Sequence, residues 1–401
     1  MTVSLFAAVE MAPRDPILGL TEAFNADPRA GKVNLGVGVY YDDNGRLPLL
    51  SAVRAAEEAR LKAQPARGYQ PIDGNAAYNQ AVRALLFGAD SEWATNGSVV
   101  TIQALGGTGA LRVGADYLKQ LLPQTSLFIS DPSWENHRAL FTAAGFPVEI
   151  YPYYDPATRG VDFAAMKQKL ATLSPRSVVL LHACCHNPTG ADLTGDAWRE
   201  VAAIVRDREL VPFLDLAYQG FADGIEQDAA AARAFADAGV QFLVASSFSK
   251  NFSLYGERVG ALSIVTASRE EANRVLSQVK RVIRANYSNP PTHGGAVVAA
   301  VLTSPELRRL WEEELAAMRD RIRAMRAGLV DALKAEGAIR DFSFITRQRG
   351  MFSFTGLDRE QVERLKAEFG IYAVSSGRIN VAALNSGNLP VVAKAIAAVT
   401  R

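Results

Sequence analysis

Short apolar runs alternate with stretches of helical periodicity between about residue 95 and residue 265. Such alternation is typical of a sheet with mostly parallel strands, because each helix carries the chain back to the edge where the next strand begins. The predicted strands are Val99–Gln103, Leu127–Ser130, Ser177–Leu181, Val211–Leu214, Phe242–Ala245 and Ala261–Val265. The sequence therefore predicts an α/β fold.

A long amphipathic helix is predicted after this region. Ser304 can cap its first turn, Pro305 suits the first helical position, and apolar residues recur at spacings of mostly three and four until Gly337 stops the pattern. We interpret this helix as the link to a second domain, because 401 residues is long for one core. We expect a large domain of residues 46–309 and a smaller α/β domain built from both chain ends, residues 1–45 and 310–401.

The composition is that of an ordinary soluble protein, with 49% hydrophobic and 21% charged residues. Its 43 basic and 42 acidic residues form no block of like charge, so neither nucleic acid nor a membrane is an expected partner. No apolar run reaches the roughly 18 residues of a membrane span, and Val3–Val9 is too short for a signal peptide. Two adjacent cysteines, Cys184 and Cys185, suit a reducing cytosol. We expect a cytoplasmic protein.

A lysine stands just after the predicted strand Phe242–Ala245, in the segment Ser246-Ser247-Phe248-Ser249-Lys250. A deprotonated lysine amine is a nucleophile that condenses with aldehydes, and partial burial lowers its pKa toward neutrality. Most lysines after strands are solvated surface residues, so Lys250 alone is a weak signal. It gains weight from the residues at the ends of the other strands, because open parallel sheets bind ligands at the carboxyl ends of their strands.

The strand Val99–Gln103 leads into the glycine turn Gly106-Gly107-Thr108-Gly109 and then into a helical pattern. Glycines at a helix N-terminus expose backbone N–H groups where the helix dipole favours an anion. The spacing matches neither a P-loop nor GxGxxG, which disfavours a nucleoside triphosphate or a dinucleotide. A plain tight turn and a phosphate site are about equally compatible with this segment taken alone.

Residues suited to an aromatic ligand follow three further strands. Trp134 can stack on a planar ring, although tryptophan is more often a core residue, and Asn187 lies in the turn Asn187-Pro188-Thr189-Gly190. Asp215 ends an apolar strand, where a carboxylate needs a positive partner such as a protonated pyridine nitrogen. Tyr218 and Arg258 add a hydroxyl and a guanidinium.

The segment His182-Ala183-Cys184-Cys185-His186 also suggests zinc. Its spacing matches no familiar pair of ligands, and no second Cys/His cluster completes a tetrahedral site. We therefore expect no metal. A ligand that fits all the strand ends is an aromatic aldehyde with a phosphate and a ring nitrogen, and the predicted cofactor is pyridoxal phosphate.

The sequence resembles the fold-type I, class I aminotransferases, in the subgroup of bacterial aspartate and aromatic-amino-acid aminotransferases. The resemblance extends from Asp15-Pro16-Ile17 to Gly377-Arg378-Ile379, and its most specific runs are His186–Gly190, Ser249–Phe252 and Arg284–Pro291. It implies a large domain with a mostly parallel seven-stranded sheet, a smaller α/β domain, and a homodimer with shared active sites.

The resemblance also implies roles for single residues. Lys250 would attach the cofactor and move a proton, Asp215 would keep the pyridine nitrogen protonated, and His182 would support Asp215 from behind. Tyr218 and Asn187 would bond the phenolic oxygen, and Trp134 would stack on the ring. The residues expected around the phosphate and the rest of the cofactor are Gly107, Thr108, Ser247, Ser249, Arg258 and Tyr69.

For the substrate, the resemblance implies that Arg378 clamps the α-carboxylate, a bidentate geometry that suits arginine better than lysine. Gly38, Trp134 and Asn187 would line the substrate site, and Tyr69 and Arg284 would reach the site of the neighbouring subunit. Arg284 would pair with the side-chain carboxylate of aspartate, glutamate or their oxo acids.

The implied activity is a ping-pong transamination between an aromatic amino acid (tyrosine or phenylalanine, and also aspartate) and 2-oxoglutarate. The segments Thr101-Ile102-Gln103 and Trp134-Glu135-Asn136-His137 favour the aromatic subgroup, whereas Thr108 and Asn289 match the aspartate pattern. The alternative is therefore an aspartate aminotransferase with little aromatic activity. A lyase or decarboxylase that uses the same cofactor and a binding module without turnover are further alternatives.

Overall fold

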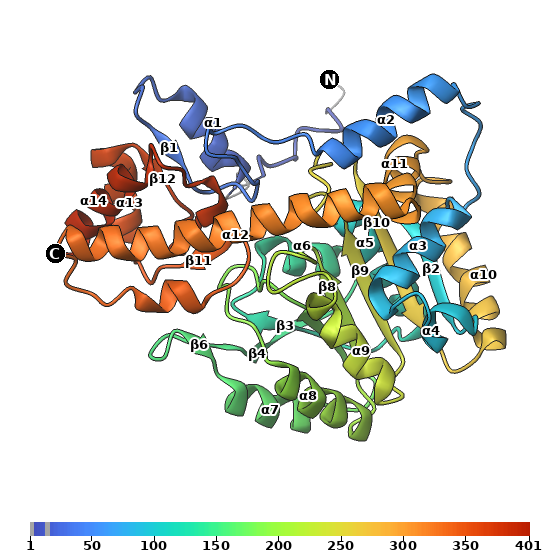
Figure 1. Ribbon diagram of the computed structural model, residues 1–401. Helices are drawn as coiled ribbons and strands as arrows, with labels where there is room; N and C mark the ends of the chain where they lie inside the picture. Colours follow the sequence, from blue (N-terminus) through green and yellow to red (C-terminus); the bar gives the residue numbers. More distant parts are fainter. Residues whose placement is uncertain (1–3, 13–16) are drawn as a thin grey trace.

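A computed structural model of the chain describes residues 4–12 and 17–401 (Figure 1). Val3, Asp15 and Pro16, which belong to the N-terminal segments considered above, lie outside the described residues. No helix within the described ranges combines the length and the hydropathy that crossing a bilayer requires.

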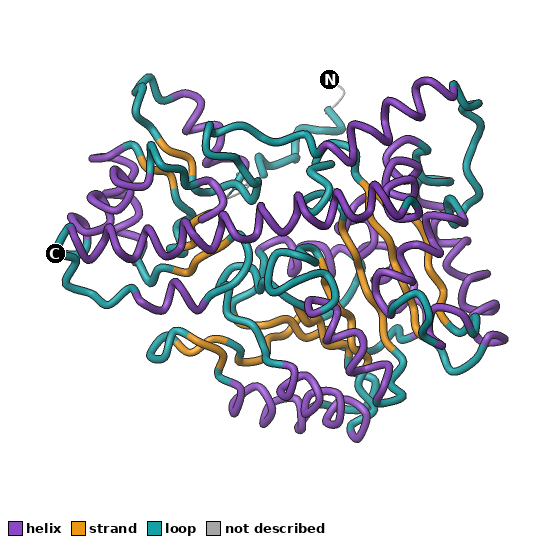
Figure 2. The backbone as a smooth tube through the Cα atoms, viewed as in Figure 1, coloured by secondary structure: helices purple, strands orange, loops and turns teal. Residues whose placement is uncertain are grey.

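The described residues contain a seven-stranded sheet with helices on both faces (Figures 1 and 2). The strand order is β2-β10-β9-β8-β7-β3-β4, and only β10 runs antiparallel to its neighbours. The strands are β2 Val99–Leu105, β3 Leu127–Asp131, β4 Val148–Pro152, β7 Val178–His182, β8 Val211–Leu216, β9 Phe242–Ser247 and β10 Val259–Val265. The predicted α/β fold with a mostly parallel seven-stranded sheet is confirmed.

All six strands expected from the sequence form, with ends that move by one or two residues. The central strands β7, β9 and β10 are buried at every position, which explains why they stand out as continuous apolar runs. The unpredicted strand β4 lies at the edge of the sheet and is mostly exposed. Because one face and one edge of β4 meet solvent, its sequence carries no comparable apolar signal.

Two apolar layers enclose the sheet. On one face, α5 (Gly106–Leu121), α6 (Glu135–Ala143) and α10 (Arg269–Asn286) share a core with alternate residues of the strands. On the other face lie α3 (Ala76–Phe87), α7 (Phe163–Thr172), α8 (Gly195–Asp207) and α9 (Ala230–Asp237). This three-layer arrangement leaves the carboxyl ends of the parallel strands free to carry polar residues.

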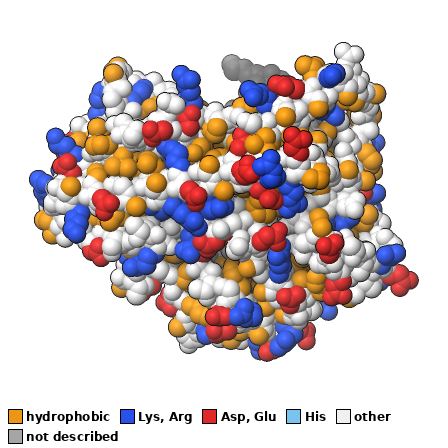
Figure 3. Space-filling view, viewed as in Figure 1, with side chains coloured by type: hydrophobic (Ala, Val, Ile, Leu, Met, Phe, Trp, Pro, Cys, Tyr) orange, Lys and Arg blue, Asp and Glu red, His pale blue; other side chains and the backbone are white. Residues whose placement is uncertain are grey.

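The long helix α12 (Pro305–Ala335) crosses the molecule from the sheet to the C-terminal part (Figure 1). Ser304 caps it by accepting a hydrogen bond from the backbone N–H of Leu307, Pro305 occupies its first turn, and Gly337 follows it with a φ of +70°. The predicted helix and both of its end signals are confirmed. On the face of the molecule seen in Figure 3, Lys and Arg side chains are interspersed with Asp and Glu side chains.

Both chain ends pack together beside the C-terminal half of α12 (Figure 1). Strand β1 (Val33–Asn34) pairs in parallel with β12 (Ile371–Tyr372), and β11 (Phe352–Phe354) pairs with β13 (Arg378–Asn380). The surrounding helices are α1 Leu18–Ala26, α13 Arg359–Phe369 and α14 Leu389–Val399. The pairing agrees with a smaller α/β unit made from both ends, and the boundaries at residues 45/46 and 309/310 stay predictions.

The remaining elements connect these parts. They are α2 Ser51–Ala63, α4 Glu92–Thr95, β5 Tyr154–Asp155, β6 Gly160–Val161, η1 Gln227–Ala229, α11 His293–Thr303, η2 Ser343–Arg347 and η3 Val381–Ala383. Of these, η2 leads into the segment before β11, and that segment lies against the turn at Gly190. It therefore brings the smaller unit into contact with the residues at the strand ends.

Candidate active site

A cavity of about 420 Å³ opens at the carboxyl ends of the central strands. It is lined by thirteen of the residues expected from the sequence: Gly38, Gly107, Thr108, Trp134, His182, Asn187, Asp215, Tyr218, Ser247, Ser249, Lys250, Arg258 and Arg378. These residues come from segments up to 340 positions apart in the chain. The sheet brings most of them to one edge, and the smaller unit adds Gly38 and Arg378.

Lys250 follows β9 and points its amine toward the ring of Tyr218, 4.8 Å from the ring centroid. Desolvation in the cavity lowers the pKa of the Lys250 amine to about 8, with Asp215 opposing the shift and Arg258 adding to it. A substantial fraction of the amine is therefore neutral, and thus nucleophilic, near physiological pH.

Asp215 is buried at the end of β8, where His137 supports it. Nε2 of His137 lies 3.0 Å from Oδ2 of Asp215, and Nδ1 of His137 lies 2.9 Å from Oγ of Ser133. Burial raises the pKa of Asp215, but the bond with His137 and the nearby Lys250 outweigh burial, and the net pKa is lowered. The carboxylate thus stays charged and suits a protonated ring nitrogen.

The support that the resemblance assigned to His182 is therefore provided by His137. Neither ring nitrogen of His182 has a hydrogen-bond partner among the described residues, and its ring packs 5.0 Å from that of His137. Burial lowers the pKa of His182 to about 3, so its imidazole is neutral. Sequence reasoning missed His137 because it lies in the first turn of α6, and nothing in its spacing shows that it reaches Asp215.

The glycine run forms the first turn of α5 rather than a loop before it. A Cβ on Gly107 would lie 3.1 Å from Cβ of Ser247, and one on Gly106 would lie 2.7 Å from a guanidinium nitrogen of Arg258. Nη1 of Arg258 donates a hydrogen bond of 3.2 Å to Oγ of Ser249. Helix N–H groups, serine hydroxyls and one guanidinium thus converge in a space that suits a phosphate.

Arg378 lies on β13 and is only 1% exposed. Its Nη1 donates to Oδ1 of Asn187 at 2.9 Å and its Nη2 donates to the carbonyl of Gly36 at 2.7 Å, while Nε has no partner among the described residues. Its guanidinium lies 4.2 Å from the centroid of the Phe352 ring. Burial lowers the pKa of Arg378, although the group stays charged in the physiological range. A buried cation without a carboxylate bonded to it suits an acidic substrate.

Phe352 is a site residue that sequence reasoning missed. Besides its contact with Arg378, its ring packs edge-on against Tyr218 with 6.0 Å between centroids, and a Cβ on Gly38 would lie 2.7 Å from it. The run Phe352-Ser353-Phe354 is a short apolar strand like many others, so it carries no functional signal. Other cavity residues outside the predictions are Ile17, Val37, Leu111, Ala217 and Tyr255.

Tyr69 and Arg284 do not line the cavity of their own chain. Tyr69 is 96% exposed in the segment after α2, and Arg284 lies in the last turn of α10, where it bonds Ser288. Both positions are compatible with a reach into a neighbouring subunit, and that role stays a prediction.

The residues present fit pyridoxal phosphate. The two ring nitrogens of His182 without partners, the anion-binding first turn of α5 and the charged Asp215 leave polar groups directed at the cavity. Potential metal ligands also cluster there, namely His137, His182 and Asp215, and a second buried cluster holds Cys184, Cys185 and Asp228. The expectation that no metal is required stays a prediction.

Comparison with known proteins adds three findings. The family model "Aminotransferase class I and II" matches residues 30–396. The chain is 67% identical to the aspartate aminotransferase of Pseudomonas aeruginosa, over 98% of this chain and 99% of that protein. It is 54% identical to the aromatic-amino-acid aminotransferase of Escherichia coli, over 98% and 100% of the two chains.

A solved structure is similar throughout. The crystal structure of the aromatic-amino-acid aminotransferase from Burkholderia pseudomallei, covalently bound to pyridoxal phosphate, superimposes with a TM-score of 0.98. Its sequence is 66% identical to this one, and the match covers 100% of both chains. The likeness therefore includes every segment that forms the cavity.

Proposed function

The chain belongs to the class I and II aminotransferases, and we propose on that premise that it transfers the amino group of an aromatic amino acid or of aspartate to 2-oxoglutarate. Its cofactor is pyridoxal phosphate. The observation that carries the proposal is the meeting of Lys250, Asp215 and Arg378 in one cavity, each with the charge that its task needs.

Pyridoxal phosphate, when bound, supplies an aldehyde that condenses with amines and a protonated ring that accepts electrons. Asp215 would hold the proton on the ring nitrogen, and His137 keeps Asp215 ionised and oriented. The first turn of α5 together with Ser247, Ser249 and Arg258 would hold the phosphate. The chain would thus fix the group at both ends.

Lys250 is the base that moves the proton of the reaction. With a pKa of about 8 it both takes and returns a proton near neutral pH, which general acid–base catalysis requires. Lys250 would take the proton from the substrate α-carbon, hold it on its amine, and give it back within the same site. Burial among Tyr218 and the strand ends limits competition by water.

Arg378 would orient the substrate by binding its α-carboxylate through N–H groups on the edge of the guanidinium, where Nε has no partner among the described residues. Asn187 fixes the guanidinium from one side and Phe352 packs against it. Because both lie against the same guanidinium, the carboxylate and therefore the reacting α-carbon take one position relative to Lys250.

Two kinds of residue around the cavity would decide which substrate side chains the enzyme accepts. Ile17, Val37, Leu111 and Phe352 give the cavity apolar surface that accommodates an aromatic ring. A dicarboxylate needs a cation, which Arg284 of a second subunit would supply. The similar proteins include enzymes named for aspartate and enzymes named for aromatic amino acids, so an aspartate aminotransferase with little aromatic activity is the second candidate.

A cytoplasmic homodimer with shared sites completes the proposal. Apolar side chains of the N-terminal segment are strongly exposed, among them Leu5, Phe6 and Met11, and so is Tyr69. A second copy of the chain that covers these residues would remove apolar surface from water. Tyr69 and Arg284 of the first copy would then lie near the cavity of the second copy.

The proposal is tested by measuring kcat/KM for aspartate, tyrosine and phenylalanine with 2-oxoglutarate as acceptor. We expect glutamate and the matching oxo acid in equal amounts, with aromatic and acidic donors both used efficiently. A preference for aspartate above roughly a thousandfold, or about 4 kcal/mol of discrimination, would favour the second candidate. Release of carbon dioxide without glutamate would instead indicate a decarboxylase, and no turnover a binding module.

A further inference from the structure

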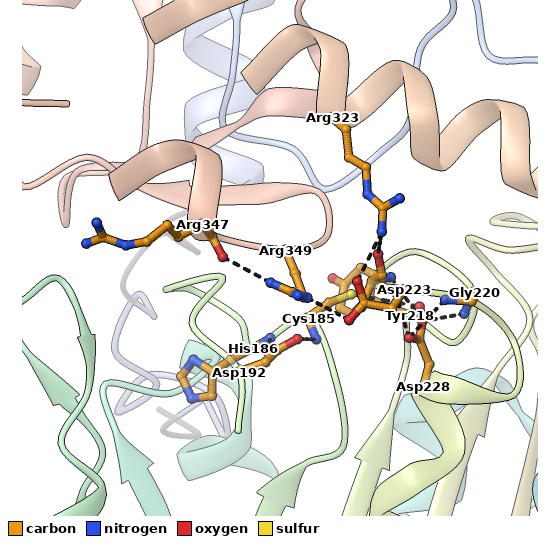
Figure 4. A network of polar contacts seen from close by, with 12 residues as sticks. Cys185, His186, Asp192, Tyr218, Gly220, Asp223, Asp228, Arg323, Arg347 and Arg349 are labelled. Atoms are coloured by element: carbon orange, nitrogen blue, oxygen red, sulfur yellow. Dashed lines mark hydrogen bonds and ion pairs between the residues drawn. The ribbon is translucent and has the colours of Figure 1, made fainter. Parts of the chain in front are cut away.

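The turn that carries Asn187 is held by a carboxylate outside the cavity. Oδ2 of Asp192 accepts a hydrogen bond of 2.7 Å from the backbone N–H of Cys185, and Oδ1 accepts one of 2.8 Å from that of His186 (Figure 4). These two N–H groups immediately precede Asn187 in the chain. One side chain therefore uses both of its oxygens to fix the approach to a site residue.

The turn needs such support because its backbone is strained. Cys185 has a φ of +52°, a left-handed conformation that residues with a Cβ rarely adopt. Downstream, the N–H of Gly190 bonds the carbonyl of His186 at 2.7 Å, and a Cβ on Gly190 would lie 2.7 Å from the carbonyl oxygen of Phe352. The turn is thus closed on itself and packed against the segment that carries Phe352.

A shift of this turn would reach the substrate clamp directly. Oδ1 of Asn187 accepts the hydrogen bond from Arg378, and the Phe352 ring packs against the same guanidinium. Asp192 itself does not line the cavity, so it contacts neither substrate nor cofactor. Its effect on the site must pass through the backbone of Cys185 and His186.

We propose that Asp192 is a positioning residue for substrate binding: through the Cys185 and His186 amides it holds Asn187, and thereby Arg378, in the arrangement that receives the substrate carboxylate. The inference rests on the proposed function for the identity of that substrate. It concerns the clamp rather than the chemistry at Lys250.

The charge of Asp192 is set by its surroundings. Burial raises its pKa to about 6, the amides of His186 and Cys185 and the cation of Arg349 oppose that rise, and Asp228 adds to it. Asp228 holds the neighbouring loop through the N–H groups of Gly220, Ala222, Asp223 and Gly224 (Figure 4). The other ionisable groups that face Asp192 are Arg326, Tyr153, Cys184 and Cys185.

None of these four groups changes charge near pH 6. Burial raises the pKa of the Tyr153 hydroxyl, and it raises the pKa of the Cys185 thiol to about 12. The hydrogen bond with Cys185, together with burial, raises the pKa of the Cys184 thiol. All three groups therefore stay neutral near pH 6. The pKa of Arg326 is lowered to about 10, so it stays charged. Arg326 and Arg349 are thus the cations that face the carboxylate of Asp192.

The discriminating variant is Asp192→Asn in the holoenzyme. An amide has one accepting oxygen, so one of the two backbone N–H groups must face an NH₂ group and lose its bond. We expect roughly tenfold weaker binding of glutarate, an unreactive dicarboxylate, and a similar rise in KM for the amino acid, with kcat changed less. Calorimetry gives the Kd of glutarate without turnover.

The split between binding and turnover separates positioning from general damage. Asp192→Asn should raise the Kd of glutarate and the KM of the amino acid together, whereas kcat at saturating amino acid should change less, because Lys250 and Asp215 are untouched. A merely structural loss would lower kcat by a similar factor.

Asp155→Asn is the matched control. Asp155 also accepts two backbone N–H bonds, from Ala157 and Thr158, but it does so in the β5–β6 hairpin, away from the cavity. It should leave the Kd of glutarate unchanged. If Asp192→Asn binds glutarate as tightly as this control does, or if it lowers kcat as much as it raises KM, the inference is wrong.

A second measurement covers the case in which Asp192→Asn does not fold. Asp192→Glu keeps the charge and both accepting oxygens on a side chain one methylene longer, so it should still weaken glutarate binding several-fold, and an unchanged Kd would contradict the inference. The proposed function fails separately, by absence of amino transfer in the unmodified protein. Glutarate binding requires no transfer, so the two failures are distinguishable.

Discussion

Asp215 lies at a position where a bare carboxylate would be strongly unfavourable, because it is buried at the end of a central strand. His137 donates to it, Ser133 fixes the other nitrogen of that imidazole, and the result is an ionised carboxylate directed at the cavity. Three side chains from a strand and the neighbouring helix terminus thus set one charge. Partners of this kind orient a functional group as much as they stabilise it.

The first prediction compares the two histidines at this position. His137→Asn should lower kcat by roughly tenfold to a hundredfold, because Asp215 loses the donor that keeps it charged and oriented. His182→Asn should have a smaller effect, since none of the residues that the structure describes hydrogen-bonds the ring of His182. Steady-state kinetics with saturating cofactor measures both. The reverse order of effects would restore His182 as the support of Asp215.

Helix α12 carries a buried arginine, Arg326, that bonds the segment leading to Phe352. Arg326 is only 2% exposed and donates to the carbonyls of Ile345, Gly350 and Phe352. Burial lowers its pKa to about 10, and the nearby Cys185 and Asp192 oppose that shift. Carbonyls of the segment that carries Phe352 thus help to offset the desolvation of this cation.

The second prediction is that Arg326→Met destabilises the fold by about 3–5 kcal/mol, because several buried carbonyls lose their donor at once. Urea denaturation measures the loss as a lower midpoint. Arg323→Met, on the same helix, should change the midpoint little, since Arg323 is half exposed and pairs with Asp223 at the surface. If both substitutions lower the urea midpoint equally, the buried hydrogen bonds of Arg326 stabilise the fold no more than a surface arginine does.

At the scale of the whole molecule, the described residues that line the cavity offer two arginines, and the proposed function gives each of them another task. Arg378 would bind the α-carboxylate, Arg258 lies beside the first turn of α5, where the phosphate is proposed to bind, and Arg284 lies outside the cavity. A homodimer that exchanges Arg284 between subunits would complete the site, as the resemblance predicts. The site would then be a property of the assembly.

The third prediction uses two inactive variants. Lys250→Ala and Arg284→Ala should each be poorly active with aspartate, yet a hybrid dimer contains one site with both residues intact. Dissociation and random reassociation of equal amounts should restore about a quarter of the unmodified activity, because half of the dimers are hybrids with one of two sites complete. If mass measurements verify hybrid dimers and no activity returns, Arg284 acts on the site of its own subunit and not on that of its neighbour.

The sequence by itself determined the fold class and most of the site. Central strands are buried on both faces, so β7, β8 and β9 are apolar over most of their length, and the polar residues after them stand out. Lys250, Asp215 and Asn187 were found for this reason. The half-exposed edge strand β4 was missed because its burial pattern leaves no such contrast.

Only the tertiary structure decided which groups act on one another across the chain. That His137 rather than His182 bonds Asp215, that Phe352 lies against Arg378, and that Asp192 fixes the amides before Asn187 are contacts between side chains and backbone set by packing. Spacing along a sequence specifies which face of an element a residue occupies. It does not specify the distance to a residue on another element, and hydrogen bonds and pKa values depend on that distance.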